Sequence, residues 1–466
     1  MLTYSFENRG KESLYEYLYR QIKEDILSNK LAADEKLPSV RALAGHLDVS
    51  TITVENAYQQ LAAEGYIYSK PKSGFFVADV SSMIPVRNKY RKENKGQMES
   101  SKKEYFADFV SNSISPDRFP FTTWTRMLRE TMAEDAEKLM RKSPSIGVFA
   151  LRKAIAEYLY QFCGMRVEPD QIVIGAGTEY LYGLIIQLLG RDKVYGVEDP
   201  GYQKIVQIYA ANQVKCVPIS MDGRGVRIRQ LEEKQVDVLH ISPSHHFPTG
   251  MVMPIRRRSD LLSWAEKNRE RYIIEDDYDS EFRLIGKPIP SLQSIDINEK
   301  VIYMNTFSKS LTSTIRISYM VLPRSLMEKY HKELDFYSCT VSNFEQYTLA
   351  RFMEKGHFEK HINRMRNFYR SQKDALIQAI KKHPQAHKVY IREEHAGLHF
   401  LLQINTDLRD EEMVERAAAK GVHISCLSEY YSEKGKASQH TLVINYSGID
   451  KVRIEKAVDL LFQSLW

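Results

Sequence analysis

The pentapeptide NTFSK occupies residues 305–309, and Arg316 follows seven residues after Lys309. A second stretch, EDDY at residues 275–278, lies upstream by about the length of one strand-and-helix unit. A lysine amine can form a Schiff base with an aldehyde, a carboxylate can keep a pyridine nitrogen protonated, and hydroxyls with a guanidinium can hold a phosphate. The two stretches together predict a pocket for pyridoxal phosphate.

Each part of this pattern also has an ordinary interpretation. Lys309 alone is compatible with a surface lysine, and IGAGT at residues 174–178 is compatible with a simple turn between a strand and a helix. The order favours a ligand site, because a glycine-rich turn opens a helix, an acidic pair ends a strand, and a lysine follows the next strand. Ligands bind at the strand ends of α/β sheets.

Length and composition limit the class of protein. A chain of 466 residues is too long for one ordinary domain, and 43% hydrophobic residues suffice for real cores. No stretch is apolar for the length that a membrane span needs, and the first residues lack the pattern of a signal peptide. The four cysteines form no CxxC pair, which favours reduced thiols. We therefore expect a cytoplasmic protein with no membrane partner.

The pattern of residues 105–466 predicts an α/β domain. Helical patterns alternate with short apolar runs at residues 172–174, 194–197, 238–241, 272–274 and 301–304. Strands that are apolar on both faces and separated by helices indicate a mostly parallel sheet between helices. From about residue 385 the chain mixes strands with a last helix, which predicts a small C-terminal α+β subdomain.

The first 79 residues predict a separate head domain. Apolar periodicity and turn signals indicate three helices and two short strands, at residues 13–28, 40–47, 51–64, 67–69 and 75–77. Three helices followed by a hairpin with a basic tip are typical of a winged helix-turn-helix domain. Residues 80–104 carry seven Lys or Arg and three Asp or Glu, and we expect a flexible basic linker there.

Charge alone does not support DNA binding by this head. The net charge of the chain is +6, and residues 1–79 carry nine Lys or Arg against eleven Asp or Glu. A DNA-binding role therefore depends on where particular side chains lie. The alternative from the pattern is a small helical module that binds other proteins, with ordinary cations on its surface.

Three stretches resemble the DNA-binding head of GntR-type bacterial regulators: LPSVRALA at residues 37–44, VSTITV at 49–54 and LAAEGYI at 61–67. The resemblance implies a double-stranded DNA operator as partner. It implies contacts from the starts of the second and third helices and from the wing, namely Ser39, Arg41, Ser50, Thr51, Thr53, Asn56, Lys70 and Lys72. Thr51 stands where that family commonly has an arginine, so the operator sequence does not carry over.

Residues 106–466 resemble the fold-type I aminotransferases, and joined to a GntR-like head the chain resembles the MocR/GabR-type transcription regulators. The resemblance implies a seven-stranded-type sheet, pyridoxal phosphate bound as a Schiff base on Lys309, and Asp276 paired with the pyridinium nitrogen. It assigns the other cofactor contacts to Gly177, Thr178, Tyr202, His245, Tyr278, Thr306, Ser308 and Arg316. A homodimer is also implied, because such pockets are usually completed by a second subunit.

The sequence favours a sensor over an enzyme. Related enzymes anchor the substrate carboxylate with an arginine in a late strand, and the matching run TLVINYS at residues 441–447 has none. Lys204 lies where some relatives use an arginine to hold an acidic effector, and a lysine makes a looser contact. We expect a regulator that senses pyridoxal phosphate, a small amine or an amino acid through the Schiff base at Lys309. The alternatives are an active aminotransferase with an accessory DNA-binding head and a cofactor-free scaffold.

A metal site is the weaker interpretation of the adjacent residues His245 and His246. No further ligands follow at usable spacing, so no metal is expected.

Overall fold

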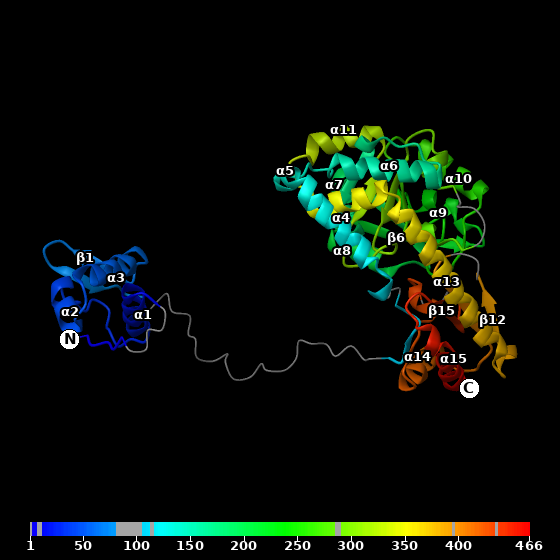
Figure 1. The fold of residues 1–466 in the computed structure, drawn as a ribbon. Coiled ribbons are helices and arrows are strands. Elements are labelled where there is room, and N and C mark those ends of the chain that lie inside the picture. Colours follow the sequence, from blue (N-terminus) through cyan, green and yellow to red (C-terminus); the bar gives the residue numbers. More distant parts are fainter. Residues whose placement is uncertain are drawn as a thin grey trace. The chain divides into compact units, whose positions relative to one another are not determined.

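The computed structural model describes residues 2–6, 12–80, 105–111, 116–284, 290–393, 397–433 and 437–466. The chain divides into two compact units, Met1–Lys102 and Lys103–Trp466 (Figure 1). Apart from Val80, the expected linker at 80–104 lies outside the described residues.

The head has the predicted winged-helix order. Its elements are α1 (Leu14–Leu27), α2 (Val40–Leu47), α3 (Thr51–Ala63), β1 (Ile67–Lys70) and β2 (Gly74–Val77). Each helix begins at a serine, because the hydroxyls of Ser13, Ser39 and Ser50 accept backbone N–H groups that have no partner within the helix. The strands pair antiparallel, with Lys70 opposite Gly74 at the tip of the wing.

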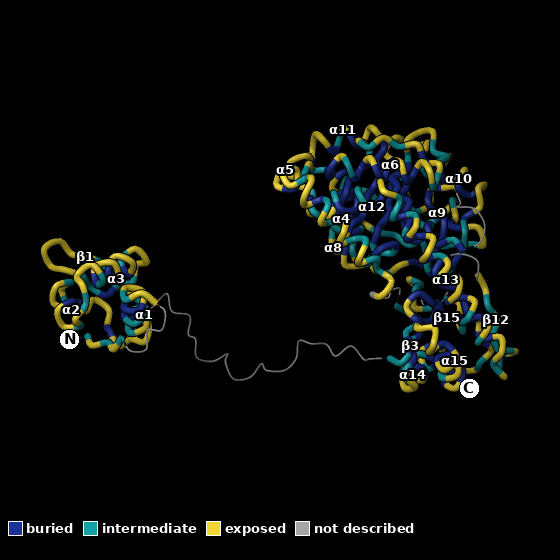
Figure 2. Tube along the Cα trace, in the orientation of Figure 1, coloured by how far each residue is buried: buried dark blue, intermediate teal, exposed yellow. Residues whose placement is uncertain are grey.

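One apolar cluster holds the head together. The apolar stripes of α1, α2 and α3 meet the first residue of the wing, and the side chains of Leu18, Leu43, Leu61 and Ile67 are at most 1% exposed. Figure 2 shows these stripes buried and the outer faces of the same helices exposed. The fold of the head therefore depends on contacts between helices that are too short to be stable alone.

Among the described residues, eight strands form the main sheet of the second unit, in the order β4-β11-β10-β9-β8-β5-β6-β7. They are β4 (Ile172–Gly175), β5 (Val194–Asp199), β6 (Lys215–Asp222), β7 (Gly225–Val226), β8 (Val238–Ile241), β9 (Tyr272–Asp277), β10 (Val301–Thr306) and β11 (Ser318–Val321). The five central strands run parallel, which confirms the predicted mostly parallel sheet. Strand β11 is antiparallel to both neighbours, and the two-residue β7 extends the other edge.

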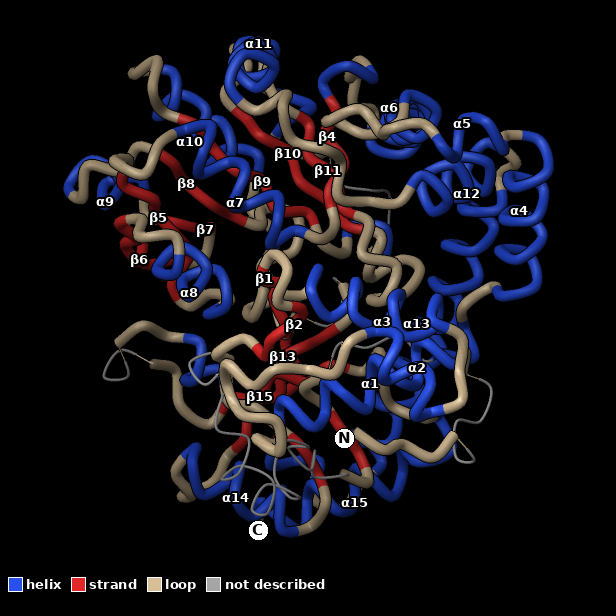
Figure 3. Tube along the Cα trace, turned by 90° about the vertical axis from the view of Figure 1, so that its left-hand side faces the viewer, coloured by secondary structure: helices blue, strands red, loops and turns tan. Residues whose placement is uncertain are grey.

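Helices cover both faces of this sheet (Figure 3). The helices of this part of the chain are α4 (Phe121–Glu134), α5 (Ala136–Met140), α6 (Phe149–Cys163), α7 (Thr178–Leu189), α8 (Gln203–Ala211), α9 (Ile228–Glu233), α10 (Ile255–Glu266), α11 (Arg324–Glu333) and α12 (Asn343–Glu354). Of these, α4 and α5 pack against α12. Ile302 and Met304 of β10 belong to one core cluster with residues of α7 and α11. Tyr303, between them, belongs to another cluster with residues of α6 and α12, because side chains alternate along a strand.

The long helix α13 (His357–Lys382) precedes the predicted C-terminal α+β subdomain. There, β12 (Val389–Arg392), β13 (His399–Ile404) and β15 (Thr441–Asn445) form an antiparallel sheet, with α14 (Asp410–Ala419) and α15 (Ile454–Leu465) beside it. A short parallel pair joins β3 (Ala107–Asp108) to β14 (Val422–His423). Brief 3-10 helices lie at Pro116–Arg118, Pro169–Gln171, Ser280–Phe282, Gln293–Ile295, Ala386–Lys388, Leu427–Tyr430 and Lys451–Arg453.

We expect Leu61→Ala to destabilise the head selectively, because it leaves a cavity in the middle of the head core. The expected cost is about 2–5 kcal/mol, seen as faster hydrogen exchange of the α1 and α3 amides. Leu27→Ala is the matched control, because Leu27 is 40% exposed at the end of α1. Equal protection in the two variants would contradict the assignment of the core.

Candidate functional site

A cavity of about 520 Å³ lies at the carboxyl ends of the parallel strands of the second unit. Strands β9 and β10 pair with Asn305 opposite Asp277, so the residues that follow each strand reach the same edge of the sheet. Eight of the ten predicted cofactor contacts line the cavity: Thr178, Tyr202, Asp276, Tyr278, Thr306, Ser308, Lys309 and Arg316. Segments as far apart in the sequence as Thr178 and Arg316 therefore meet at one cavity.

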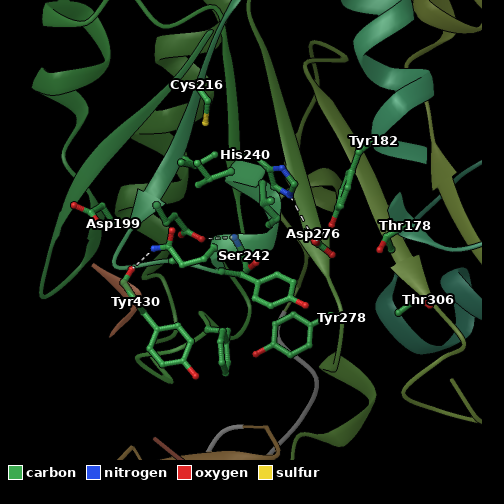
Figure 4. Close-up of a pocket in the computed structure, with 18 of the residues that line it drawn as sticks. Thr178, Tyr182, Asp199, Cys216, His240, Ser242, Asp276, Tyr278, Thr306 and Tyr430 are labelled. Carbon is green, nitrogen blue, oxygen red and sulfur yellow. Dashed lines mark hydrogen bonds and ion pairs between the residues drawn. The ribbon is translucent and has the colours of Figure 1, made fainter. Parts of the chain in front are cut away.

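Asp276 is held in place by residues that the sequence interpretation missed. The Tyr182 hydroxyl of α7 donates a hydrogen bond to Oδ2 of Asp276 at 2.5 Å, and His240 Nε2 lies 3.5 Å from the same oxygen (Figure 4). Tyr209 is in turn 2.8 Å from His240 Nδ1. The other carboxylate oxygen, Oδ1, is buried and has no hydrogen-bond partner among the described residues. A buried acceptor of this kind is expected to face a donor on a ligand.

Lys309 lies where burial favours its neutral form. Desolvation lowers the pKa of its amine to about 8, and the nearby carboxylate of Asp279 opposes that shift. Burial, with Asp279 and Asp276 nearby, raises the pKa of the Tyr278 phenol well above its ordinary value. The pocket therefore presents an amine that is readily a nucleophile and a phenol that stays protonated.

His245 does not line the cavity. It lies behind Tyr278, whose hydroxyl is 3.1 Å from His245 Nδ1, and the same nitrogen is 2.8 Å from a carboxylate oxygen of Asp279. Two residues along the chain, Phe247 lines the cavity instead. Of the predicted loop at residues 242–250, Ser242 and Phe247 line the cavity, whereas His245 does not.

The hydroxyl-rich end of the cavity is built around the start of α7. Thr306 donates to Ser308 at 3.0 Å and accepts from Ser318 at 2.8 Å. Gly177 caps α7 with a φ of 94°, and a Cβ there would overlap the guanidinium of Arg316. Glycine is therefore required where backbone and guanidinium approach closely, at a helix N-terminus suited to an anion.

Lys204 does not line the cavity and is 49% exposed in its side chain. Its ammonium forms an ion pair with Glu179, which also lies 3.0 Å from the guanidinium of Arg316. The hydrogen bond from Lys204, with the charges of Lys204 and Arg316, lowers the pKa of Glu179. The charge of Lys204 is thus already matched by a carboxylate.

The residues predicted to contact DNA lie in α2 and α3, at the N-caps of these helices, and in the wing. Arg41, Thr51, Asn56, Lys70 and Lys72 are exposed, and Thr53 is half-buried. The exposed residues Ser39 and Ser50 also act as helix caps, as described above.

Ile52 of α3 is 66% exposed, and the sequence interpretation missed it. The sequence does indicate that Ile52 lies on the outer face of the third helix, because Ile52 falls outside the helical spacing of the buried residues Val54, Ala57 and Leu61.

Two other site types find no support among the described residues. Within those ranges, no group of three or more His, Cys, Asp or Glu side chains is arranged to hold a metal ion. None of the described helices has both the length and the apolar character needed to cross a bilayer.

Comparison with known proteins agrees with this architecture. Residues 14–77 match the bacterial regulatory proteins of the gntR family, and residues 108–461 match aminotransferase class I and II. Members of this aminotransferase family normally bind pyridoxal phosphate, and GntR-type regulators bind DNA. The kynurenine aminotransferase of Pyrococcus horikoshii superposes with a TM-score of 0.67 at 24% identity, covering 83% of this chain and 98% of that one, which shows the fold.

Relatives share the whole arrangement of domains. The uncharacterized HTH-type transcriptional regulator YdeL of Bacillus subtilis is 39% identical over 448 residues, which cover 96% of each chain. The probable rhizopine catabolism regulatory protein MocR of Rhizobium meliloti is 29% identical over 96% of this chain and 93% of its own. The chain therefore belongs to the MocR-type transcription regulators, in which a GntR-type helix-turn-helix domain is joined to an aminotransferase-like domain.

Proposed function

We propose that this regulator binds pyridoxal phosphate covalently through Lys309 and that the bound cofactor, alone or with a small amine, controls its affinity for an operator. The observation that carries the proposal is the meeting of two groups in one cavity. Lys309 has a pKa lowered to about 8, and Asp276 presents a buried oxygen with no partner among the described residues. An aldehyde can react with the amine of Lys309, and a protonated pyridine nitrogen can donate to the Asp276 oxygen.

The remaining lining residues fit the other parts of the cofactor. Tyr278, kept protonated by burial, would donate to the phenolic oxygen of the ring, and Tyr202 would lie against the ring face. Thr178, Thr306 and Ser308, with the backbone of Gly177 and with Arg316, would hold the phosphate. The cofactor supplies a reactive aldehyde and an electron sink, while the protein supplies orientation and burial.

The late strand supports sensing over turnover of amino acids. All five residues of β15 are buried, and Val443 in its middle packs in an apolar cluster with Leu401 and Leu427. The sequence of β15, TLVIN, contains no arginine that could bind a substrate carboxylate. As a homodimer the protein would present two heads to a paired operator, so a change in the pocket could alter DNA binding.

We place the DNA contacts at the exposed starts of the helices and at the wing, with Arg41 and Lys72 on phosphates and Thr51, Ile52 and Asn56 toward the bases. An exposed isoleucine near the start of the recognition helix is suited to the methyl group of a thymine. The slightly acidic head has few cations, so each phosphate contact should matter individually.

We expect Lys309 to react with the aldehyde at lower pH than an exposed lysine. Because burial lowers its pKa to about 8, the neutral amine accumulates as the pH rises through that value, whereas an exposed lysine needs a pH of about 10. The measurement is the initial rate of colour formation with pyridoxal phosphate against pH. Asp279→Asn should move the midpoint lower, because it removes a charge that favours the ammonium. A wild-type midpoint of the rate profile at about pH 10 would contradict the proposal.

The affinity for DNA should depend on the cofactor and on Lys309. Gel shifts with the region upstream of the protein's own gene should differ by at least about fivefold between cofactor-loaded and cofactor-free protein. Lys309→Ala should remove the difference, and Lys332→Ala, which changes an exposed lysine of α11, should keep it. Equal affinities in all four preparations would contradict sensing through Lys309.

Arg41→Ala and Lys72→Ala should each weaken operator binding and reduce the slope of log affinity against log salt by about one, because each removes one phosphate contact. Lys30→Ala is the control, since Lys30 is 73% exposed but lies outside the proposed contact set. An unchanged salt slope in both test variants would rule out this DNA-binding surface.

A further inference from the structure

The cavity continues beyond the residues proposed to hold the cofactor. Figure 4 shows Thr178 and Thr306 at one end and Asp199 and Tyr430 at the other. Lys309 and Arg316 are the only Lys or Arg side chains among the described lining residues, and both are assigned to the cofactor. Asp199 and Tyr430 form that other end, and Glu198, the chain neighbour of Asp199, adds a second carboxyl group to the lining. The chemistry of this end is that of a site for a positively charged group.

Glu198 is the main observation for such a site. Its side chain is 8% exposed, and its Oε2 accepts the backbone N–H of Ser242 at 2.9 Å. Its Oε1 has no hydrogen-bond partner in the part of the chain that the structure describes. A buried carboxyl oxygen that lines a cavity without a donor is expected to receive one from a ligand.

Among the residues that the structure describes, no Lys or Arg side chain is paired with Glu198. His246 Nε2 lies 3.5 Å from Oε2, but burial and the adjacent His245 lower the pKa of His246 to about 3, so that ring is neutral. Burial raises the pKa of Glu198 to about 8. A ligand ammonium would offset this desolvation and return Glu198 to its ionised form.

Asp199 and the rings of Phe247 and Tyr430 complete the outer end, next to Tyr202, which is proposed for the cofactor ring. Both oxygens of Asp199 are held at 2.8 Å by Ser432, one by its backbone N–H and one by its hydroxyl. The ring of Phe247 meets those of Tyr202 and Tyr430 edge-on, with centroids 6.0 and 5.1 Å away. Aromatic faces beside fixed carboxylates favour cations through cation–π and ionic contacts together.

We infer that the outer end of the cavity binds a second cationic group, so that the effector of this regulator is a small diamine rather than an amino acid. The inference rests on the proposed function, because the first amine of the effector would reach the cofactor end near Lys309. Lys204 does not change this conclusion, because its ammonium is paired with Glu179 outside the lining. A carboxylate tail would meet the charge of Asp199 and would leave the desolvated carboxyl group of Glu198 without a cation.

Three amines with four carbon atoms each distinguish the possibilities, because the far end is an ammonium in putrescine, a methyl in butylamine and a carboxylate in γ-aminobutyrate. The full-length protein is first loaded with pyridoxal phosphate and checked for its colour, and the dissociation constants are then measured by calorimetry. Putrescine should bind at least about tenfold more tightly than butylamine, and γ-aminobutyrate should bind most weakly. This comparison needs no variant, so a folding defect cannot obscure it.

Variants then locate the preference. Asp199→Asn and Glu198→Gln should each remove most of the advantage of putrescine and leave butylamine unchanged, whereas Glu328→Gln, at an exposed site on α11, should leave all three constants unchanged. Loaded protein that binds γ-aminobutyrate most tightly, shows no preference, or binds none of the three would overturn the inference while leaving cofactor binding standing. Protein that never takes up the cofactor would overturn the proposed function as well.

Discussion

The parallel pairing of β9 with β10 is the constraint on which the site depends. In this register Met304 lies opposite Asp276, and both face the side of the sheet that α7 covers, where Tyr182 donates to the Asp276 carboxylate. A slip of one residue would turn Asp276 to the opposite face and away from the cavity. Strand β11 then returns antiparallel along β10, with Ser318 opposite Thr306, and brings the preceding Arg316 back to the same edge.

Desolvation sets the pKa values of the key groups at this edge of the sheet. The same burial that lowers the pKa of Lys309 raises that of Glu198, so both groups are driven toward their neutral forms near physiological pH. A cofactor aldehyde and a ligand ammonium relieve these costs at opposite ends of one cavity. Binding at either end therefore changes the charge of Lys309 or Glu198 as well as their contacts. Such a change in the pocket can alter the DNA affinity of the head.

Much of this could be predicted from the sequence, because it depends on local order. Apolar periodicity with turn signals indicated the head, and apolar runs between helices indicated the parallel sheet. The positions of Asp276 and Lys309 followed from the rule that strand ends meet. Contacts between distant segments could not be predicted from the sequence. Tyr182 and Glu198 reach the site from a helix and a strand whose orientations are fixed only by packing. The ion pair of Lys204 with Glu179 could not be predicted either, because the sequence shows which residues are charged but not which of them lie close together.

Peptide mapping after borohydride reduction tests the proposed covalent bond between Lys309 and the cofactor. Full-length protein incubated with pyridoxal phosphate, reduced and digested should show the mass of one reduced cofactor on the peptide that contains Lys309. The same peptide from Lys309→Ala should show none. A modification spread over exposed lysines, or no mass gain on the Lys309 peptide, would contradict the account.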